Sequence, residues 1–123
     1  MGGYCNHPTE PCTMTDLAGR RCKPCQGGQP LEMARAREIL EQLDDGWKLD
    51  ESGKEIRRSF EFKNFHETMA FVNALAWIAH HEDHHPDLLV GYRRCVVRFS
   101  THALDGLSEN DFICAAKVDA LVR

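Results

Sequence analysis

The sequence has 123 residues, of which 42% are hydrophobic and 28% charged, and its formal net charge is −4 with histidine neutral. These values are typical of one folded domain, and the acidic balance argues against non-specific binding to nucleic acid or anionic membranes, which needs a basic face. No apolar run approaches the ~20 residues that span a bilayer, and the N-terminus lacks the apolar segment of a secretory signal. We therefore expect a cytoplasmic protein with no membrane or nucleic-acid partner.

The first 30 residues are rich in Gly, Pro, Cys and Thr and show no periodicity, so we interpret residues 1–30 as an N-terminal arm and residues 31–123 as the folded domain. The arm contains four of the six cysteines: Cys5, Cys12, Cys22 and Cys25. Only one pair is closely spaced, whereas a tetrathiolate zinc site normally shows two close pairs. Two interpretations stay open, which are a zinc site in the arm and a mobile arm that carries free thiols.

The folded part begins with a predicted helix over residues 31–45, where apolar residues fall on one side and charged residues lie between them. A glycine at position 46 ends this helix. A short strand is predicted at residues 47–49 and, after a polar turn, a second strand at residues 56–62, where apolar and polar residues alternate. Asn64 is the expected N-cap of a long helix, whose wide apolar face predicts packing across a sheet.

The long helix is expected to end by about His84, because Pro86 disfavours helical geometry at the residue before it. A third strand is predicted from about residue 92 to 101. Two downstream cysteines, Cys95 and Cys114, lie in apolar surroundings and are interpreted as small buried hydrophobic residues.

A last helix is predicted from Ser108, with Asp111 as its capping-box partner, to about residue 121. The expected order is α-β-β-α-β-α. This order indicates an α+β fold with three to four antiparallel strands and helices packed on one face. The sheet edges would stay open, and a small domain with an open edge often closes it by pairing with a second copy. We therefore expect a homo-oligomer.

Four of the seven histidines fall within six positions: His80, His81, His84 and His85. One interpretation is a solvated helix end, where partly protonated histidines suit the negative end of the helix dipole. A second is a zinc site, because residues 81–85 match H-E-x-x-H, although Pro86 interrupts the helix that this motif needs and only His102 could add a third ligand. A third is acid–base catalysis without metal, since imidazole exchanges protons near neutral pH.

A set of short motifs at fixed distances covers the second half of the chain: His80-x-x-x-His84-His85-Pro86-Asp87, Gly91-Tyr92-Arg93, Ser100-Thr101-His102 and Gly106-Leu107-Ser108-Glu109-Asn110-Asp111. The segments FEFKN at 60–64 and Phe71-Val72 extend it upstream. As a set, these motifs resemble the pterin-4a-carbinolamine dehydratase family over residues 31–121.

The resemblance implies a hydro-lyase that dehydrates 4a-hydroxytetrahydropterin to quinonoid dihydropterin and so recycles the pterin cofactor of aromatic amino acid hydroxylation. It implies a pterin substrate, no metal and no bound cofactor. It also implies a four-stranded antiparallel sheet with helices on one face, assembled as dimers or tetramers. Some relatives are dimerisation partners of transcription factors, so a regulatory binding module without enzymatic activity is the alternative.

The family's three catalytic histidines fall on His84, His85 and His102. In this interpretation His102 is the acid near the 4a-hydroxyl, His84 acts on the N5 side, and His85 orients the pterin. Two positions depart from the family pattern. Aliphatic residues at 88 and 89 stand where many members have an aromatic residue, and a histidine at position 80 replaces a frequent acidic residue.

Three further residues are expected to contribute to substrate binding. Pro86 and Asp87 are expected to shape a loop that lies on the pterin. Asp111 matches an acidic position of the family near the site, and this role is compatible with its capping of the last helix.

Overall fold

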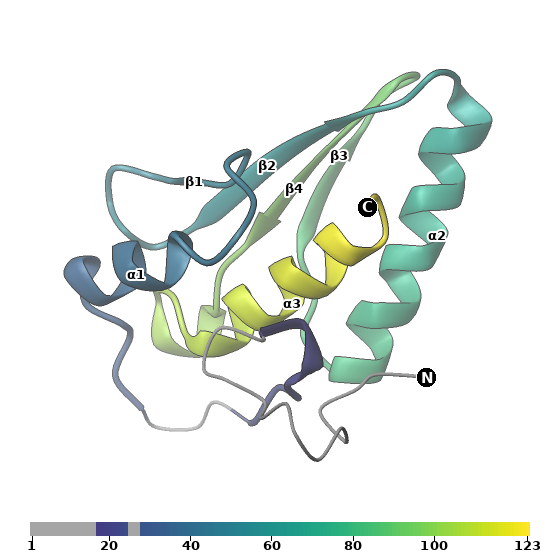
Figure 1. Ribbon diagram of the computed structural model, residues 1–123. Coiled ribbons are helices and arrows are strands. Elements are labelled where there is room, and N and C mark those ends of the chain that lie inside the picture. Colours follow the sequence, from purple (N-terminus) through teal and green to yellow (C-terminus); the bar gives the residue numbers. More distant parts are fainter. Residues whose placement is uncertain (1–16, 25–27) are drawn as a thin grey trace, which may run out of the picture.

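The computed structural model describes residues 17–24 and 28–123 (Figure 1). Its helices and strands follow in the order η1 (Leu17–Gly19), α1 (Met33–Leu40), β1 (Lys48–Leu49), β2 (Ile56–Glu61), α2 (Phe65–Glu82), β3 (Asp87–Val90), β4 (Arg94–Phe99), η2 (His102–Leu104) and α3 (Glu109–Ala120), where η denotes a 3-10 helix. No helix within the described ranges combines the length and apolar character that a membrane crossing requires.

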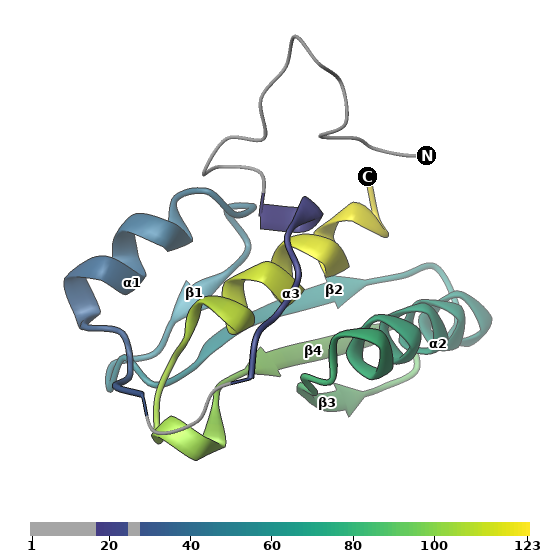
Figure 2. The same ribbon diagram turned by 90° about the horizontal axis from the view of Figure 1, so that it is seen from below.

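The four strands form one antiparallel sheet in the order β1-β2-β4-β3. All three α-helices lie on the same face of this sheet, with α3 crossing the middle of it and α2 lying beside β3 and β4 (Figure 2). The predicted α+β class and the helix-covered antiparallel sheet are therefore confirmed. The predicted N-cap of α2 is also confirmed, because the Asn64 side chain accepts a hydrogen bond of 2.8 Å from the Glu67 amide.

Two predicted elements need correction. Asp87, which is expected in a loop, instead begins β3, an edge strand that was not predicted from the sequence. All four residues of β3 are exposed, so the strand lacks the alternating pattern that identifies a half-buried strand. Helix α1 ends at Leu40, not at residue 45 as predicted, because the chain turns there and continues through Leu43 into β1.

The core lies between the sheet and the helices. Its largest fully buried side chains include Phe99, Phe112, Ile56, Leu75 and Leu107. Both downstream cysteines, Cys95 and Cys114, are fully buried, which confirms their prediction as small core residues.

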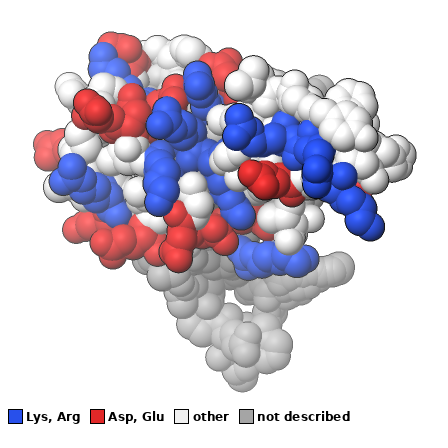
Figure 3. Space-filling model, turned by 90° about the horizontal axis from the view of Figure 1, so that it is seen from above, with Lys and Arg blue, Asp and Glu red and all other residues white. Residues whose placement is uncertain are grey.

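The opposite face of the sheet is exposed and carries basic side chains, which gather over the strands in Figure 3. The register places Lys48, Arg57 and Arg98 in one row across three neighbouring strands. All three are exposed, so their charges are solvated. The functional groups with buried partners lie instead on the helical side.

The described part of the predicted arm packs onto the domain. Leu17 of η1 is buried in the core, and Lys117 of α3 donates a hydrogen bond of 2.8 Å to the Ala18 carbonyl. The boundary at residue 30 stays a prediction. The zinc interpretation of the arm involves Cys5, Cys12 and Cys25, which lie outside the described residues.

One buried carboxylate connects three separate parts of the fold. Asp119 of α3 is 3% exposed and accepts hydrogen bonds from the Trp47 indole at 2.9 and 3.0 Å and from Arg58 of β2 at 2.5 Å. The Arg58 guanidinium also lies over the Phe60 ring, 4.3 Å from its centroid. The carboxylate therefore fixes α3 to the hairpin and to the loop before it.

We expect Asp119→Ala to lower the free energy of unfolding by about 3–5 kcal/mol, because it leaves a partly buried guanidinium and a buried indole N–H without their acceptor. Urea denaturation of parent and variant measures this difference. Glu38→Ala is the matched control, since Glu38 lies in a helix and pairs with Arg35 at 2.8 Å but its side chain is 68% exposed. The control change should stay below about 1 kcal/mol. Equal losses in the two variants would contradict the prediction.

Candidate active site

The ends of three elements surround one cavity of about 630 Å³ on the helical side of the sheet. These are the C-terminus of α2, the segment from the end of β4 into η2, and the start of α3. The cavity brings together His84, His85 and His102, which the sequence analysis selected from positions up to 18 residues apart. The lining is completed by Arg21, Cys22, Lys23, Pro24, His81, Glu82, Asp83, Ser100, Thr101, Ala103 and Asn110.

The end of α2 determines how two of these histidines enter the cavity. The helix ends at Glu82, and the next residue, Asp83, adopts a left-handed conformation with φ 53° and ψ 43°. The His84 amide then donates to the Ala79 carbonyl at 3.1 Å, which satisfies an acceptor at the helix end. The chain thus leaves the helix axis immediately before the two histidines.

This turn also separates the two histidines of the H-E-x-x-H match. His81 lies within α2, where its ring stacks on Trp77 at 4.8 Å, whereas His85 lies beyond the left-handed residue. The motif requires both histidines on one continuous helix, and that condition is not met. Across residues 17–24 and 28–123, no group of three or more His, Cys, Asp or Glu side chains is arranged to hold a metal ion.

His84 has the most constrained side chain of the three histidines. Its Nε2 lies 2.6 Å from Oδ1 of Asp111, and its ring stacks parallel to Phe99 at a centroid distance of 6.1 Å. A carboxylate only accepts hydrogen bonds, so Nε2 carries the proton in this contact. The other ring nitrogen, Nδ1, is then the one that can accept a proton from a bound molecule.

Asp111 is fully buried and uses both of its oxygens. Oδ2 accepts hydrogen bonds from the Thr101 hydroxyl at 2.7 Å and from the Ser108 amide at 3.0 Å, while Oδ1 faces His84. The contact with Ser108 forms part of the predicted capping box, which is confirmed. The same carboxylate therefore begins α3 and orients a histidine of the cavity.

The other two histidines are more accessible. His85 and His102 are exposed, and both line the cavity. His102 begins η2, directly after Thr101, whose backbone is bridged to Gly106. The cavity therefore combines one oriented, nearly buried imidazole with two that are open to solvent.

Residues 21–24, here called the strap, form a further wall of the cavity that was not predicted from the sequence. Glu82 holds the strap by accepting from the Cys22 amide at 2.8 Å and from Arg21 at 3.0 Å. Asn110 holds it from α3, with its amide group donating to the Lys23 carbonyl at 2.5 Å and accepting from the Lys23 amide at 3.0 Å. The segment has no periodicity, and these partners are 60 and 87 residues away, so no local signal marks it.

The remaining predicted site residues lie near the cavity without lining it. Pro86 follows His85 and is half-buried, and Asp87 is exposed in β3, where it lies opposite Arg98 in the strand register.

The pKa of Glu82 is lowered from its ordinary value. Burial of the side chain raises the pKa, but the hydrogen bond from the Cys22 amide and the charges of Lys117 and Arg21 outweigh burial. The carboxylate is therefore favoured in the folded chain, and it contributes to stability wherever it is ionised.

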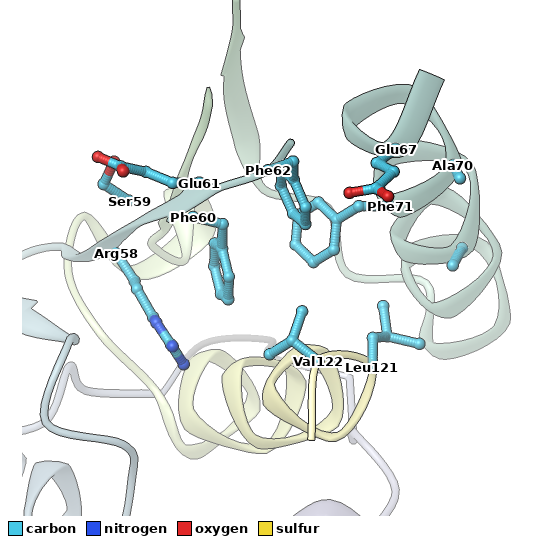
Figure 4. Close-up of a pocket in the computed structure, with 11 residues that line it drawn as sticks. Arg58, Ser59, Phe60, Glu61, Phe62, Glu67, Ala70, Phe71, Leu121 and Val122 are labelled. Atoms are coloured by element: carbon cyan, nitrogen blue, oxygen red, sulfur yellow. The ribbon is translucent and has the colours of Figure 1, made fainter. Parts of the chain in front are cut away.

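A second cavity, of about 650 Å³, lies between β2, α2 and the end of α3 (Figure 4). The side chains of Phe60, Phe62, Phe71, Leu121 and Val122 point into it. None of its lining residues is shared with the histidine cavity, and no histidine lines it. Histidines thus line the first cavity and not the second. The second, here called the apolar groove, is lined mainly by apolar side chains, although Arg58, Glu61 and Glu67 also line it.

Comparisons with known proteins agree on one family. The family model described as pterin 4 alpha carbinolamine dehydratase matches residues 29–121. A protein of Nitrosomonas europaea that is assigned by name to these dehydratases is 60% identical over 109 residues, covering 88% of this chain and 95% of its own length. A Stenotrophomonas maltophilia protein with the same assignment is 63% identical over 108 residues, covering 87% and 92%.

Two solved structures are also similar. The crystal structure of a transcriptional coactivator/pterin dehydratase from Brucella melitensis matches with a TM-score of 0.73 and 34% identity, covering 77% of this chain and all of that one. A pterin dehydratase-like protein identified as a RuBisCO assembly factor in the alpha-carboxysome matches with a TM-score of 0.54 and 26% identity, covering 62% and 88%.

We expect Glu82→Gln to lower the free energy of unfolding by about 1–3 kcal/mol at neutral pH, because it removes a buried charge that accepts two hydrogen bonds. The folded-state pKa is lowered, so this stabilisation is present above the unfolded-state pKa of about 4.3 and is lost as the pH falls through the folded-state value. Urea denaturation at neutral pH and at about pH 3 should therefore show a difference that shrinks in acid.

Glu109→Gln is the control for this measurement. Glu109 pairs with Arg20 at 2.9 Å, but its side chain is 43% exposed, so its loss should cost less than about 1 kcal/mol. A Glu82→Gln variant as stable as the parent at neutral pH would show that the strap does not depend on this carboxylate.

Proposed function

The chain belongs to the pterin 4 alpha carbinolamine dehydratase family, and from this premise we propose that it dehydrates 4a-hydroxytetrahydropterin to quinonoid dihydropterin. The reaction recycles the pterin cofactor of aromatic amino acid hydroxylation. The observation that carries the proposal is the convergence of His84, His85 and His102 on one cavity within the matched region. A dehydration assay with purified protein and its histidine variants tests it.

The proposed reaction needs two proton transfers, one to the hydroxyl group on C4a and one from N5, the nitrogen bonded to C4a. The C4a–O bond breaks after the hydroxyl gains a proton, and water leaves. The N5–H proton is removed, and its electron pair forms the C4a=N5 double bond. One proton is given and one is taken, so the chemistry requires an acid and a base but no redox partner.

We assign the proton removal at N5 to His84 and the protonation of the hydroxyl to His102. The contact with Asp111 supports the first assignment, because a carboxylate at Nε2 stabilises the imidazolium that forms when Nδ1 accepts a proton. The exposure of His102 supports the second, since an accessible imidazole can be protonated again from solvent. His85 is assigned to orienting the pterin, and Pro86 and Asp87 to fixing the backbone that follows it.

We expect His84→Ala and His102→Ala each to lower kcat by about 10²–10⁴-fold, while His85→Ala has a smaller effect on kcat. Loss of a proton-transfer group acts on the transition state, whereas loss of a group that only binds mainly raises KM. Steady-state kinetics of the purified variants, with folding checked by circular dichroism, measure this. Near-parental kcat in folded His84→Ala and His102→Ala would overturn the assignment.

Asp111→Asn provides a finer comparison. An asparagine can present an N–H to His84, so the imidazole need no longer keep its proton on Nε2. We expect kcat to fall and the pH–rate profile to change shape. Urea denaturation separates this effect from the loss of helix capping.

We propose that the activity requires neither a metal nor a bound cofactor. The proton transfers can all be made by side chains, and the turn at Asp83 interrupts the only sequence motif for zinc in this region. The parent enzyme is therefore expected to retain its kcat after dialysis against a chelator. Loss of activity that returns on addition of zinc would contradict this proposal.

A second candidate function is that of a regulatory binding module for a partner protein. The apolar groove favours it, because Leu121 and Val122 at its edge are 40% and 42% exposed. The two similar solved structures are those of a transcriptional coactivator/pterin dehydratase and of a pterin dehydratase-like RuBisCO assembly factor, so this fold supports such roles in other proteins. An assay of dehydratase activity in the purified protein distinguishes the two candidates. A folded protein without activity would have binding as its function, whereas an active protein would be an enzyme that could also bind a partner.

We also propose that the chain is a homo-oligomer, a dimer or a tetramer, that pairs through β3. This edge strand contacts β4 on one side only and exposes 62% of Leu89, so its outer edge can accept another strand. Size-exclusion chromatography with light scattering should give at least twice 14.0 kDa at micromolar concentration. A single species of 14.0 kDa across a dilution series would contradict it.

A further inference from the structure

Two cysteines far apart in the sequence lie in contact, one in the strap and one in α3. The sulfur atoms of Cys22 in the strap and Cys114 in α3 lie 3.4 Å apart, although 92 residues separate them. Cys22 is partly exposed, and its Sγ also lies 3.7 Å from the carbonyl oxygen of Asn110. Cys114 is fully buried. One thiol of the pair is therefore accessible from solvent, and the other is protected directly behind it.

We propose that Cys22 and Cys114 are a site of reversible oxidation, at which a hydroperoxide converts the two thiols into a disulfide that fastens the strap to α3. The third cysteine in the described ranges, Cys95, is buried in β4 and has no recorded sulfur contact with either of them. The sulfurs of the pair need to approach from 3.4 Å to about 2.05 Å. The short strap, with a partly exposed cysteine, is the side that can move.

The chemistry balances with one hydroperoxide per pair. The Cys22 sulfur attacks the terminal peroxide oxygen, the O–O bond breaks, and an alcohol or water leaves with a proton. The resulting sulfenic acid is then attacked by the Cys114 sulfur, the S–O bond breaks, and the departing hydroxide takes the thiol proton to form water. Two thiols lose two electrons and the peroxide gains them.

The surroundings of the two sulfurs favour this order of events. The hydrogen bond to Cys22 and burial together raise the pKa of the Cys114 thiol well above its ordinary value. A protonated, buried thiol is a poor first nucleophile, so the partly exposed Cys22 is the residue that meets the peroxide. Its sulfenic acid then forms in contact with Cys114, whose thiol can condense with it to a disulfide. Oxidation of Cys22 also replaces the thiol whose hydrogen bond is the main cause of the raised Cys114 pKa.

The disulfide would change how the strap is held. Without it, the strap depends on hydrogen bonds and charge contacts from Glu82 and Asn110. With it, one wall of the histidine cavity is covalently joined to the helix that contains Asp111. This inference does not depend on the dehydratase reaction, because it concerns only the two thiols and the attachment of the strap.

The test uses the full-length chain, fully reduced, desalted and treated with hydrogen peroxide at a stoichiometry of about one per chain. Trypsin digestion without reductant and mass spectrometry then identify the linked peptides. We expect peptide 22–35 joined to peptide 99–117 with the loss of two hydrogens, reversal by dithiothreitol, and a higher Tm for the oxidised protein. Peptide 22–35 also contains Cys25, so variants must assign the link.

Four single-cysteine variants make the assignment. Cys25→Ser and Cys95→Ser should keep the link to peptide 99–117, whereas Cys22→Ser should abolish both the link and the rise in Tm. Cys114→Ser should behave like Cys22→Ser, and if the loss of this core residue unfolds the chain, the comparison of Cys22→Ser with Cys25→Ser still decides. A disulfide between Cys22 and Cys25, a link between two chains, or oxidation of Cys22 to a sulfinic acid without a link would overturn the proposal.

Discussion

The buried carboxylate of Asp111 is the contact on which the candidate site depends. It accepts from Ser108 at the start of α3, from Thr101 after β4, and faces His84 beyond the end of α2. Without this carboxylate, no single group would contact the ends of all three elements. Because a fully buried charge is unfavourable unless its hydrogen bonds are made, the three ends must meet in one arrangement, and the cavity between them has a defined shape.

Helix α3 contains two such carboxylates, and they serve different parts of the protein. Asp119, two turns after Asp111, joins the helix to Trp47 and Arg58 on the hairpin side. Asp111 joins it to the histidine side. The helix is buried over most of its length. Small buried residues such as Ala115 and Ala116 let it lie close to the sheet between these two contacts. The hairpin and the cavity are thus held at the two ends of one rigid element.

Much of this fold could be predicted from local patterns in the sequence, since they reflect local physics. The alternation in β2, the N-cap at Asn64 and the capping box at Ser108 each involve residues within a few positions of one another. Strand β3 could not be found in this way, because an exposed edge strand has no buried face to set a pattern. The strap escaped prediction for a different reason, since its partners Glu82 and Asn110 become neighbours only when the chain is folded.

For the site residues too, the sequence shows which residue types cluster, whereas only the fold shows which of them meet. The clustering of His84 and His85 is visible in the sequence, and the family resemblance adds His102. Their convergence on one cavity depends on the left-handed turn at Asp83 and on the course of β4, which only the structure shows. The contact between the sulfurs of Cys22 and Cys114, which are 92 residues apart, is likewise a property of the folded chain.

Because α3 follows β1 to β4 and α2 in the sequence, its emergence determines when the site can form during synthesis. All four strands and α2 emerge from the ribosome before α3, yet they lack the helix that covers the middle of the sheet (Figure 2). Until α3 has emerged, the histidines have no Asp111 to orient them and the core residues of the sheet remain uncovered. A nascent chain that lacks α3 therefore presents apolar surface to chaperones and proteases, and its cavity becomes complete only once α3 has emerged.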